Sequence, residues 1–127
     1  MNSCRLTVTN GLFFTRVALI EGKTIYVTML LVDTGSNYTI LSWETLASLR
    51  VDPAASPVRR SLMTANGLIQ APEVTVEELH CFGKVLKQFP VVAHSIPLGS
   101  SVGGVLGMNF LRRCATNLNF TNATIAV

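Results

Sequence analysis

Apolar and polar residues follow a β pattern over most of the chain. Short runs rich in β-branched, aromatic and aliphatic side chains are separated by Gly, Asn and Pro, which is typical of strands joined by turns. The expected strands are residues 6–9, 13–20, 24–32, 58–65, 68–76, 77–81 and 85–94. The expected turns are Asn10-Gly11, a three-residue hairpin loop at Glu21-Gly22-Lys23, and residues 82–84. The pattern therefore predicts a mostly β protein.

One short helix is expected within this β pattern. Ser42 is a good N-cap, and Trp43, Leu46 and Leu49 recur at helical spacing, so we expect a helix that runs to residue 49 with Trp43 in the core. Residues 52–57 contain two prolines and are expected to form a loop without a strand.

The pair Asn66-Gly67 is the strongest short hairpin signal in the sequence. Both residues tolerate the positive φ angles of a type I′ turn, and apolar strand-like runs flank them. From the residues alone this is a plain structural hairpin between residues 58–65 and 68–76.

The stretch from residue 30 to 42 joins two apolar runs through a polar turn. Leu30-Leu31-Val32 leads directly into Asp33-Thr34-Gly35. Because a buried, unpaired carboxylate is costly, Asp33 must either be hydrogen-bonded in a turn or share its charge with another group. An Asx turn with Gly35 at positive φ would account for the three residues alone. The apolar residues on both sides favour a functional carboxylate.

A second group of residues, 104–113, also combines an apolar strand with a tight joint. It contains a two-residue apolar strand at 105–106, a glycine at Gly107 that permits close approach of the backbone, and a short helix whose last turn carries Arg112-Arg113. The preceding residues 97–104 are expected to form a flexible Gly/Ser loop. They lack the residue pattern of a phosphate-binding loop.

Composition indicates a surplus of apolar surface. The 127 residues are 49% apolar and 13% charged, with a mean hydropathy of +0.44, and burial against a second subunit is one ordinary outcome for such a chain. There is no apolar run of about 18 residues, and residues 1–5 do not have the pattern of a signal peptide. We therefore expect no membrane segment.

The charged and metal-ligating residues exclude several other classes. The net charge is +3, but the basic pairs Arg59-Arg60 and Arg112-Arg113 lack interleaved aromatic residues, so nucleic-acid binding is not expected. No metal ion, cofactor or disulfide framework is expected, because the cysteines and histidines have no ligand spacing. These residues are Cys4, Cys81, Cys114, His80 and His94.

Together the two stretches resemble the retropepsin-like (clan AA) aspartic proteases of the single-domain retroviral and bacterial type. Residues 31–36 match the signature of two hydrophobic residues followed by Asp-Thr/Ser-Gly-Ser/Ala. Gly107 and Asn109 match the downstream element, in which two hydrophobic residues precede Gly-x-Asp/Asn; many bacterial relatives have Asp at the position of Asn109. The two motifs occur in the family order about 70 residues apart, and the resemblance extends from about residue 12 to the end.

The resemblance implies a fold for the whole chain. Residues 1–127 would form one retropepsin-like barrel with a flap hairpin and one or two short helices, working as a two-fold homodimer. Gly107 and Asn109 would pack behind the catalytic loop. The terminal segments 115–120 and 124–127 would be closing strands, which form the dimer sheet in retroviral members.

The resemblance also implies roles for the catalytic loop. Asp33 would be catalytic, Thr34 would hydrogen-bond across the two-fold axis, and Gly35 would leave room for the substrate backbone. From its chemistry, the Ser36 hydroxyl can donate to the Asp33 carboxylate, which would lower the pKa of the catalytic pair and shift the activity optimum toward acid.

The implied substrate-binding residues belong to two segments. Asn37 and Tyr38 would face the subsites, although Tyr38 is equally consistent with core packing. In the flap, Thr64, Ala65, Asn66 and Gly67 would bind the backbone of an extended peptide over the scissile bond.

The chemistry of this class determines the number of subunits. Two neighbouring carboxylates must share one proton, because like charges so close do not both ionise. The chain has one such motif, and its only other aspartate, Asp52, lies in the proline-rich loop. The second carboxylate must therefore come from another copy, which predicts a homodimeric aspartic endopeptidase acting on extended polypeptides.

An alternative from another class is a catalytically silent retropepsin fold that serves as a dimerisation or peptide-binding module. The intact motif at residues 33–36 favours the enzyme, because a silent site has no reason to keep a costly carboxylate pair. The sequence leaves the compartment open between the cytoplasm and a soluble domain released from a larger or anchored protein. It does not reveal the cleavage specificity.

Overall fold

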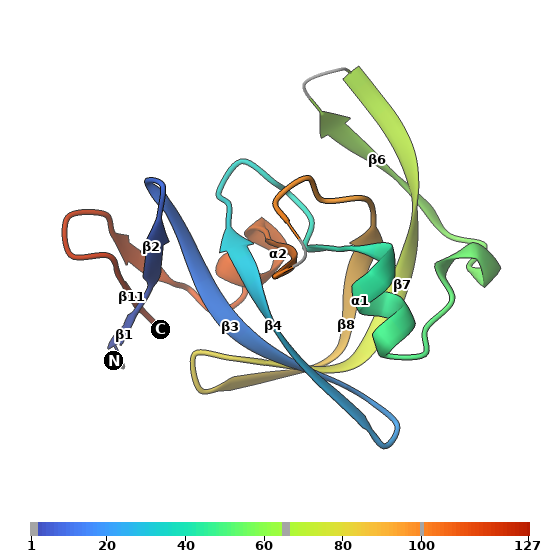
Figure 1. Cartoon of the computed structure of the whole chain (residues 1–127), viewed down its shortest axis with the longest axis horizontal. Coiled ribbons are helices and arrows are strands. Elements are labelled where there is room, and N and C mark those ends of the chain that lie inside the picture. Colours follow the sequence, from blue (N-terminus) through green and yellow to red (C-terminus); the bar gives the residue numbers. More distant parts are fainter. Residues whose placement is uncertain (1–2, 65–66, 100) are drawn as a thin grey trace.

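The computed structural model describes residues 3–64, 67–99 and 101–127, and most of these residues lie in strands (Figure 1). The strands are β1 (Ser3–Arg5), β2 (Thr7–Thr9), β3 (Leu12–Glu21), β4 (Thr24–Val32), β5 (Ile40–Leu41), β6 (Arg59–Thr64), β7 (Gly67–Cys81), β8 (Lys84–Ala93), β9 (Val102–Leu106), β10 (Asn117–Asn119) and β11 (Thr124–Ala126). The helices are α1 (Trp43–Ser48), the short 3-10 helix η1 (Pro53–Ala55) and α2 (Met108–Leu111). The prediction of a mostly β chain with short helices is confirmed.

The main sheet closes into a barrel. Strands β3, β4, β9, β5, β8 and β7 lie side by side in this order, and β3 also pairs with β7. At this closure Leu19 lies opposite Leu79 in antiparallel register. β2 extends the sheet beside β3, and β6 extends it beside β7. Closure satisfies the strand edges that an open sheet would leave unpaired.

Strand β9 lies between β4 and β5, parallel to β4 and antiparallel to β5. It begins at Val102, so the expectation of a flexible loop up to residue 104 is wrong for residues 102–104. The glycines there serve close packing, because a Cβ on Gly104 would overlap the Ile40 carbonyl and a Cβ on Gly103 would lie 2.5 Å from Thr28 Oγ1.

The chain ends form a separate three-stranded sheet. β11 lies in its centre and pairs antiparallel with β1 on one side and β10 on the other, with Ala126 opposite both Ser3 and Asn117. The two termini therefore lie close together (Figure 1). The predicted closing strands at the end of the sequence are confirmed.

Two-residue turns join several neighbouring strands. The turn predicted at Asn10-Gly11 is present with both residues at positive φ, and the Phe82-Gly83 turn has the same geometry. Glu21 pairs with Thr24, so the hairpin loop after β3 has two residues, Gly22 and Lys23, and the expected three-residue loop is wrong.

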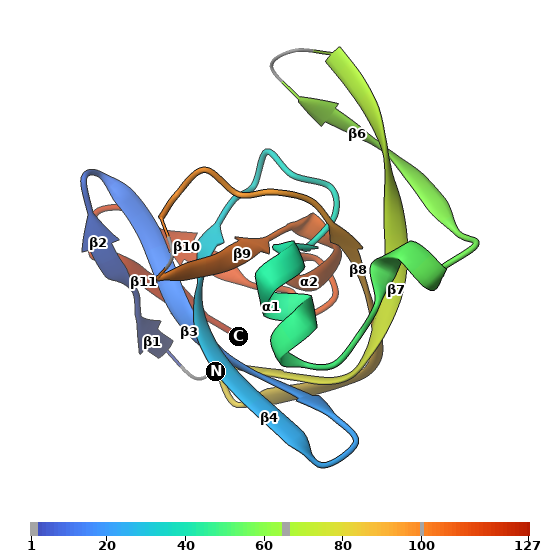
Figure 2. The same cartoon turned by 45° about the vertical axis from the view of Figure 1, so that its right-hand side comes forward.

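Strands β6 and β7 form the hairpin that Asn66-Gly67 predicts. They pair in antiparallel register from Arg59 opposite Pro72 to Thr64 opposite Gly67. The hairpin projects from the body of the protein in both views, on the same side as the loop that follows β4 (Figures 1 and 2). The residues predicted in its tip, Ala65 and Asn66, lie outside the described residues.

Helix α1 begins where the capping signal predicts. The Ser42 hydroxyl accepts a hydrogen bond of 3.1 Å from Thr45 N. Leu46 and Leu49 are fully buried, but Trp43 is 40% exposed. The expectation that Trp43 packs in the core is wrong, because it occupies the first position of the helix, on the side facing solvent.

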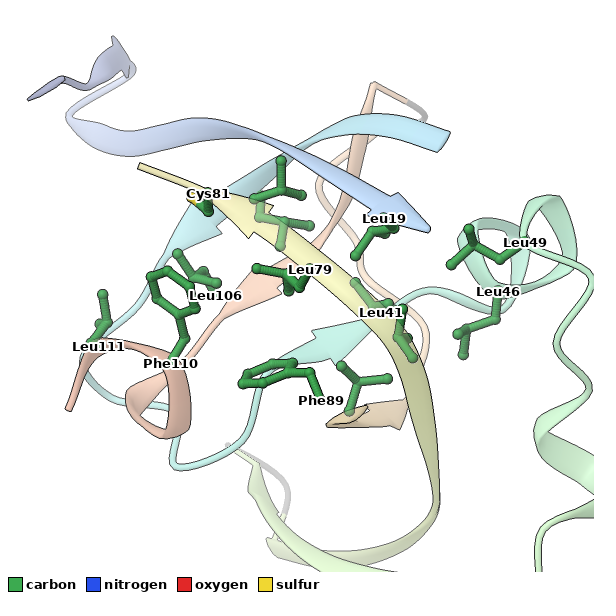
Figure 3. Close-up of a cluster of buried hydrophobic side chains, with 14 of the residues drawn as sticks. Leu19, Leu41, Leu46, Leu49, Leu79, Cys81, Phe89, Leu106, Phe110 and Leu111 are labelled. Atoms are coloured by element: carbon green, nitrogen blue, oxygen red, sulfur yellow. The ribbon is translucent and has the colours of Figure 1, made fainter. Parts of the chain in front are cut away.

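The barrel encloses one large core of aliphatic and aromatic side chains (Figure 3). Phe89 and Phe110 meet edge to face with ring centroids 6.3 Å apart. Phe110 and Leu111 of α2 are buried in the same cluster, which attaches this short helix to the barrel. Each such side chain stabilises the fold by roughly 1.5–3 kcal/mol relative to exposure. No helix of the described residues is long and apolar enough to cross a membrane.

Candidate active site

Asp33 lies at the point where β4 leaves the barrel. β4 and β9 run parallel, with Val32 beside Leu106, and Asp33 N donates the next hydrogen bond, of 3.0 Å, to Leu106 O. The backbone of Asp33 is therefore fixed by the barrel, although its side chain lies in a loop. Asp33 is half-buried and Thr34 is exposed.

The Asp33 carboxylate is held by the backbone of its own turn. Oδ1 accepts a hydrogen bond of 2.8 Å from Gly35 N, which is an Asx-type turn. Gly35 does not have positive φ, so the expectation of a left-handed conformation at this glycine is wrong. A Cβ on Gly35 would lie only 3.1 Å from Asp33 Oδ1, so glycine leaves space around the carboxylate.

The Ser36 hydroxyl is directed away from the carboxylate. It donates a hydrogen bond of 2.6 Å to Tyr38 O, and a hydroxyl has one proton to donate. The expectation that it donates to the Asp33 carboxylate is therefore wrong. Ser36 instead fixes the turn through residue 38.

Gly107 and its neighbours lie directly against the back of this loop. Met108 N donates a hydrogen bond of 2.7 Å to Ser36 O. A Cβ on Gly107 would overlap the Tyr38 carbonyl oxygen and would lie 2.9 Å from Ser36 O, so only glycine fits between the two segments. The structure thus brings the two sequence motifs into contact.

Thr39 is a polar residue of this site that the sequence reasoning missed. It is fully buried, and its hydroxyl donates to Asn109 Oδ1 at 2.7 Å while accepting from Gly107 N at 3.1 Å. Asn109 Nδ2 donates in turn to Pro90 O at 3.1 Å, on β8. The only signal in the sequence is a hydroxyl residue at the start of the apolar run that follows Tyr38.

The remaining predicted site residues lie beside the loop and on the hairpin. Asn37 is exposed. Tyr38 is half-buried and packs against a small cluster that contains Leu62 in the middle of β6, so it connects the loop to the hairpin. At the other end of the hairpin, Thr64 and Gly67 pair across the strands, and Gly67 has φ of +108°.

Two shallow hollows adjoin the loop. The first, of about 470 Å³, is lined by Thr34, Met108, Leu111, Arg112, Ala115, Thr116, Leu118 and Phe120. The second, of about 490 Å³, is lined by Asn37, Met108, Asn109, Arg112 and Arg113. Arg112 caps the C-terminus of α2 and Arg113 follows it, so the expectation that both lie in the last helical turn is wrong. Within the described ranges, no three His, Cys, Asp or Glu residues are arranged to hold a metal ion.

A barrel of this topology, with an Asp-Thr-Gly loop against a Gly-x-Asn joint, defines the retropepsin-like class of fold. A retropepsin-like aspartic protease from Rickettsia conorii has the same fold: its crystal structure superposes with a TM-score of 0.71 over 98% of this chain and 88% of that chain, at 22% identity. A family model described as Aspartyl protease matches residues 17–110, which include both motifs. The chain belongs to the aspartyl protease family.

One curated relative is similar in sequence. It is an uncharacterized protein in the cobV 5′ region of Sinorhizobium sp., 34% identical over 102 residues, which are 80% of this chain. The chain spans only 41% of that relative's length. The likeness therefore concerns a part of the longer protein.

Proposed function

We propose that the protein is an aspartic endopeptidase in which Asp33 of two subunits activates a water molecule. The observation that supports this most directly is the placement of Asp33, a half-buried residue at the end of a barrel strand whose carboxylate accepts a hydrogen bond from Gly35 N. Its backbone is fixed by β9, and the loop around it is fixed by Gly107 and Thr39. Such preorganisation suits a catalytic group.

The reaction follows from two carboxylates that share one proton. The ionised Asp33 takes a proton from water, and the water oxygen attacks the carbonyl carbon of the peptide bond. The protonated Asp33 of the second subunit donates a hydrogen bond to the carbonyl oxygen as negative charge develops on it. Proton transfer to the amide nitrogen then breaks the C–N bond, and no covalent acyl-enzyme forms.

A two-fold homodimer follows from the same chemistry, because each chain supplies one motif. Thr34 is exposed next to Asp33, where it can hydrogen-bond to its counterpart across the axis. The first hollow also lies beside Thr34, and its apolar lining offers surface for burial against a partner. Asp33 would then lie at the subunit boundary.

The substrate would bind between the catalytic loop and the hairpin of β6 and β7. Asn37 and Tyr38 of this loop would contact the peptide, and the predicted flap residues 64–67 would cover it. An extended peptide there would bind through main-chain hydrogen bonds and fill alternating side-chain subsites.

Cleavage of a broad peptide library at acid and neutral pH tests the proposal. We expect products from the wild type, a loss of activity by at least about 1,000-fold in Asp33→Asn, and inhibition of the wild type by a statine-type compound. Asp52→Asn is the matched control, because Asp52 is the only other aspartate. Its Oδ1 accepts a hydrogen bond from Ala54 N and so caps η1.

Two results would contradict the proposal. Equal cleavage by the wild type and Asp33→Asn would show that another group performs the reaction. Peptide binding by both proteins, without cleavage by either, would identify a silent peptide-binding module.

A further inference from the structure

The second hollow, lined by Asn37, Met108, Asn109, Arg112 and Arg113, carries an uncompensated positive charge next to the catalytic loop. Both arginine residues are exposed. In the part of the chain that the structure describes, Arg60 is the only arginine or lysine with an ion-pair partner, so neither guanidinium in the hollow is neutralised by a carboxylate of its own chain.

The carboxylates of the chain are almost all engaged elsewhere. All seven acidic residues are among the described residues, and six of them accept hydrogen bonds within the protomer: Glu21, Asp33, Asp52, Glu73, Glu77 and Glu78. The seventh, Glu44, lies in the first turn of α1, where the helix dipole favours an acid. Most acidic residues of a second copy would have to share or leave these contacts to pair with the hollow, whereas a substrate carboxylate would not.

Two residues that line the hollow are held by hydrogen bonds to their surroundings. Asn109 is held by Thr39 and by Pro90 O, and Met108 N is bound to Ser36 O of the catalytic loop. Arg112 lines this hollow and also the neighbouring one that contains Thr34, so its side chain lies close to the residue after Asp33. A ligand bound by the two arginines would therefore also be close to Asn37, in the loop that follows Asp33.

We propose that this hollow is a subsite that selects an acidic side chain of the polypeptide substrate. A carboxylate would accept charge-assisted hydrogen bonds from the Arg112 and Arg113 guanidinium groups, and Asn37 would contact the adjoining part of the peptide. This inference rests on the proposed function, because it takes the peptide to lie along the catalytic loop.

Paired peptide libraries test the subsite. The two libraries are identical except that one position carries Glu in the first and Gln in the second, and the fixed position is scanned along the peptide. At one position we expect the wild type to cleave the Glu library with a kcat/KM about tenfold higher, the effect expected for one charge-assisted hydrogen bond. The preference should shrink as salt is raised.

The variant Arg113→Gln removes one positive charge from a residue that lines only the second hollow, so it should lose most of this preference and cleave the Glu library at close to the rate of the Gln library. Lys23→Gln is the matched control, because it removes a positive charge in the turn between β3 and β4, at the far end of that hairpin from the catalytic loop (Figure 1). It should retain the preference in full. Equal cleavage of the Glu and Gln libraries by the wild type at every position would overturn the inference.

A binding measurement separates this inference from the proposed function. Fluorescence anisotropy of labelled Glu and Gln peptides on Asp33→Asn reports the subsite without catalysis. A Glu preference that depends on Arg113 supports the subsite even if the wild type cleaves nothing. If the arginine variant changes only the dimer dissociation constant, or if no peptide binds, the subsite is wrong.

Discussion

The Thr39 hydroxyl donates a hydrogen bond of 2.7 Å to Asn109 Oδ1 and thereby connects the two motifs of the chain across 70 positions of sequence. The same oxygen accepts a buried hydrogen bond of 3.1 Å from Gly107 N, and Thr39 itself is fully buried. The loop that follows Asp33 is therefore linked to the second motif by one side chain, in addition to the bond from Met108 N to Ser36 O. Neither motif contains that side chain.

Replacement of Thr39 by Val should destabilise the protein by about 1–3 kcal/mol, because Gly107 N loses its partner in a buried place and Asn109 Oδ1 loses its partner in a part-buried one. Val keeps the shape of Thr, so the loss reports the hydroxyl. Urea unfolding followed by circular dichroism measures it. Thr39→Ser is the control, since it keeps the hydroxyl and should lose less stability. Equal losses in the Val and Ser variants would show that the hydroxyl stabilises the protein no more than the methyl group does, which would contradict this prediction.

Replacement of Ser36 by Ala should leave the pH–rate profile where it is. The hydroxyl donates to Tyr38 O, so its removal takes no hydrogen bond from the Asp33 carboxylate. We expect a loss of stability of about 1 kcal/mol, the usual value of one hydrogen bond. The measurement is kcat/KM of wild type and variant over a range of pH with a peptide substrate. A shift of the profile toward neutral pH would show that Ser36 acts on the carboxylate.

The strands, the hairpin and the capped helix could be predicted because their signals are local. Alternating apolar residues, Asn-Gly pairs and an N-cap serine each act within a few residues, and the structure confirms these elements. The contact between the two motifs came from the family resemblance. No local pattern would show that Gly107 lies against Tyr38 O.

The errors concern features that depend on distant partners. Gly103 and Gly104 indicate a flexible loop when read locally, but they belong to β9. Thr28 and Ile40 of the neighbouring strands leave no room for a side chain at these two positions. The direction of the Ser36 hydroxyl depends on the path of the loop at residue 38. Thr39 is an ordinary strand residue in sequence, and only the fold brings Asn109 to it.

Cys81 should make the stability of the protein fall with rising pH between about 9 and about 12. Burial raises the pKa of its thiol from 9.0 to about 12, so in this range the unfolded chain loses a proton that the folded protein keeps. The stabilisation is complete below pH 9 and disappears as the pH rises toward 12. Urea unfolding at several pH values measures the slope. Cys81→Ala should have a shallower slope than the wild type, and equal slopes would contradict the assignment.

A mixture of wild type and Asp33→Asn tests whether the active site is shared between subunits. If each active site needs Asp33 from both chains, mixed dimers are inactive. After full subunit exchange, an equal amount of the variant should lower the activity of a fixed amount of wild type to about half, the statistical expectation for random pairing in a two-fold dimer. Peptide cleavage before and after incubation of the mixture measures this, and Asp52→Asn serves as the added control because it keeps Asp33. If the activity does not fall while native mass spectrometry with an isotope-labelled variant shows that mixed dimers have formed, each chain carries a complete active site.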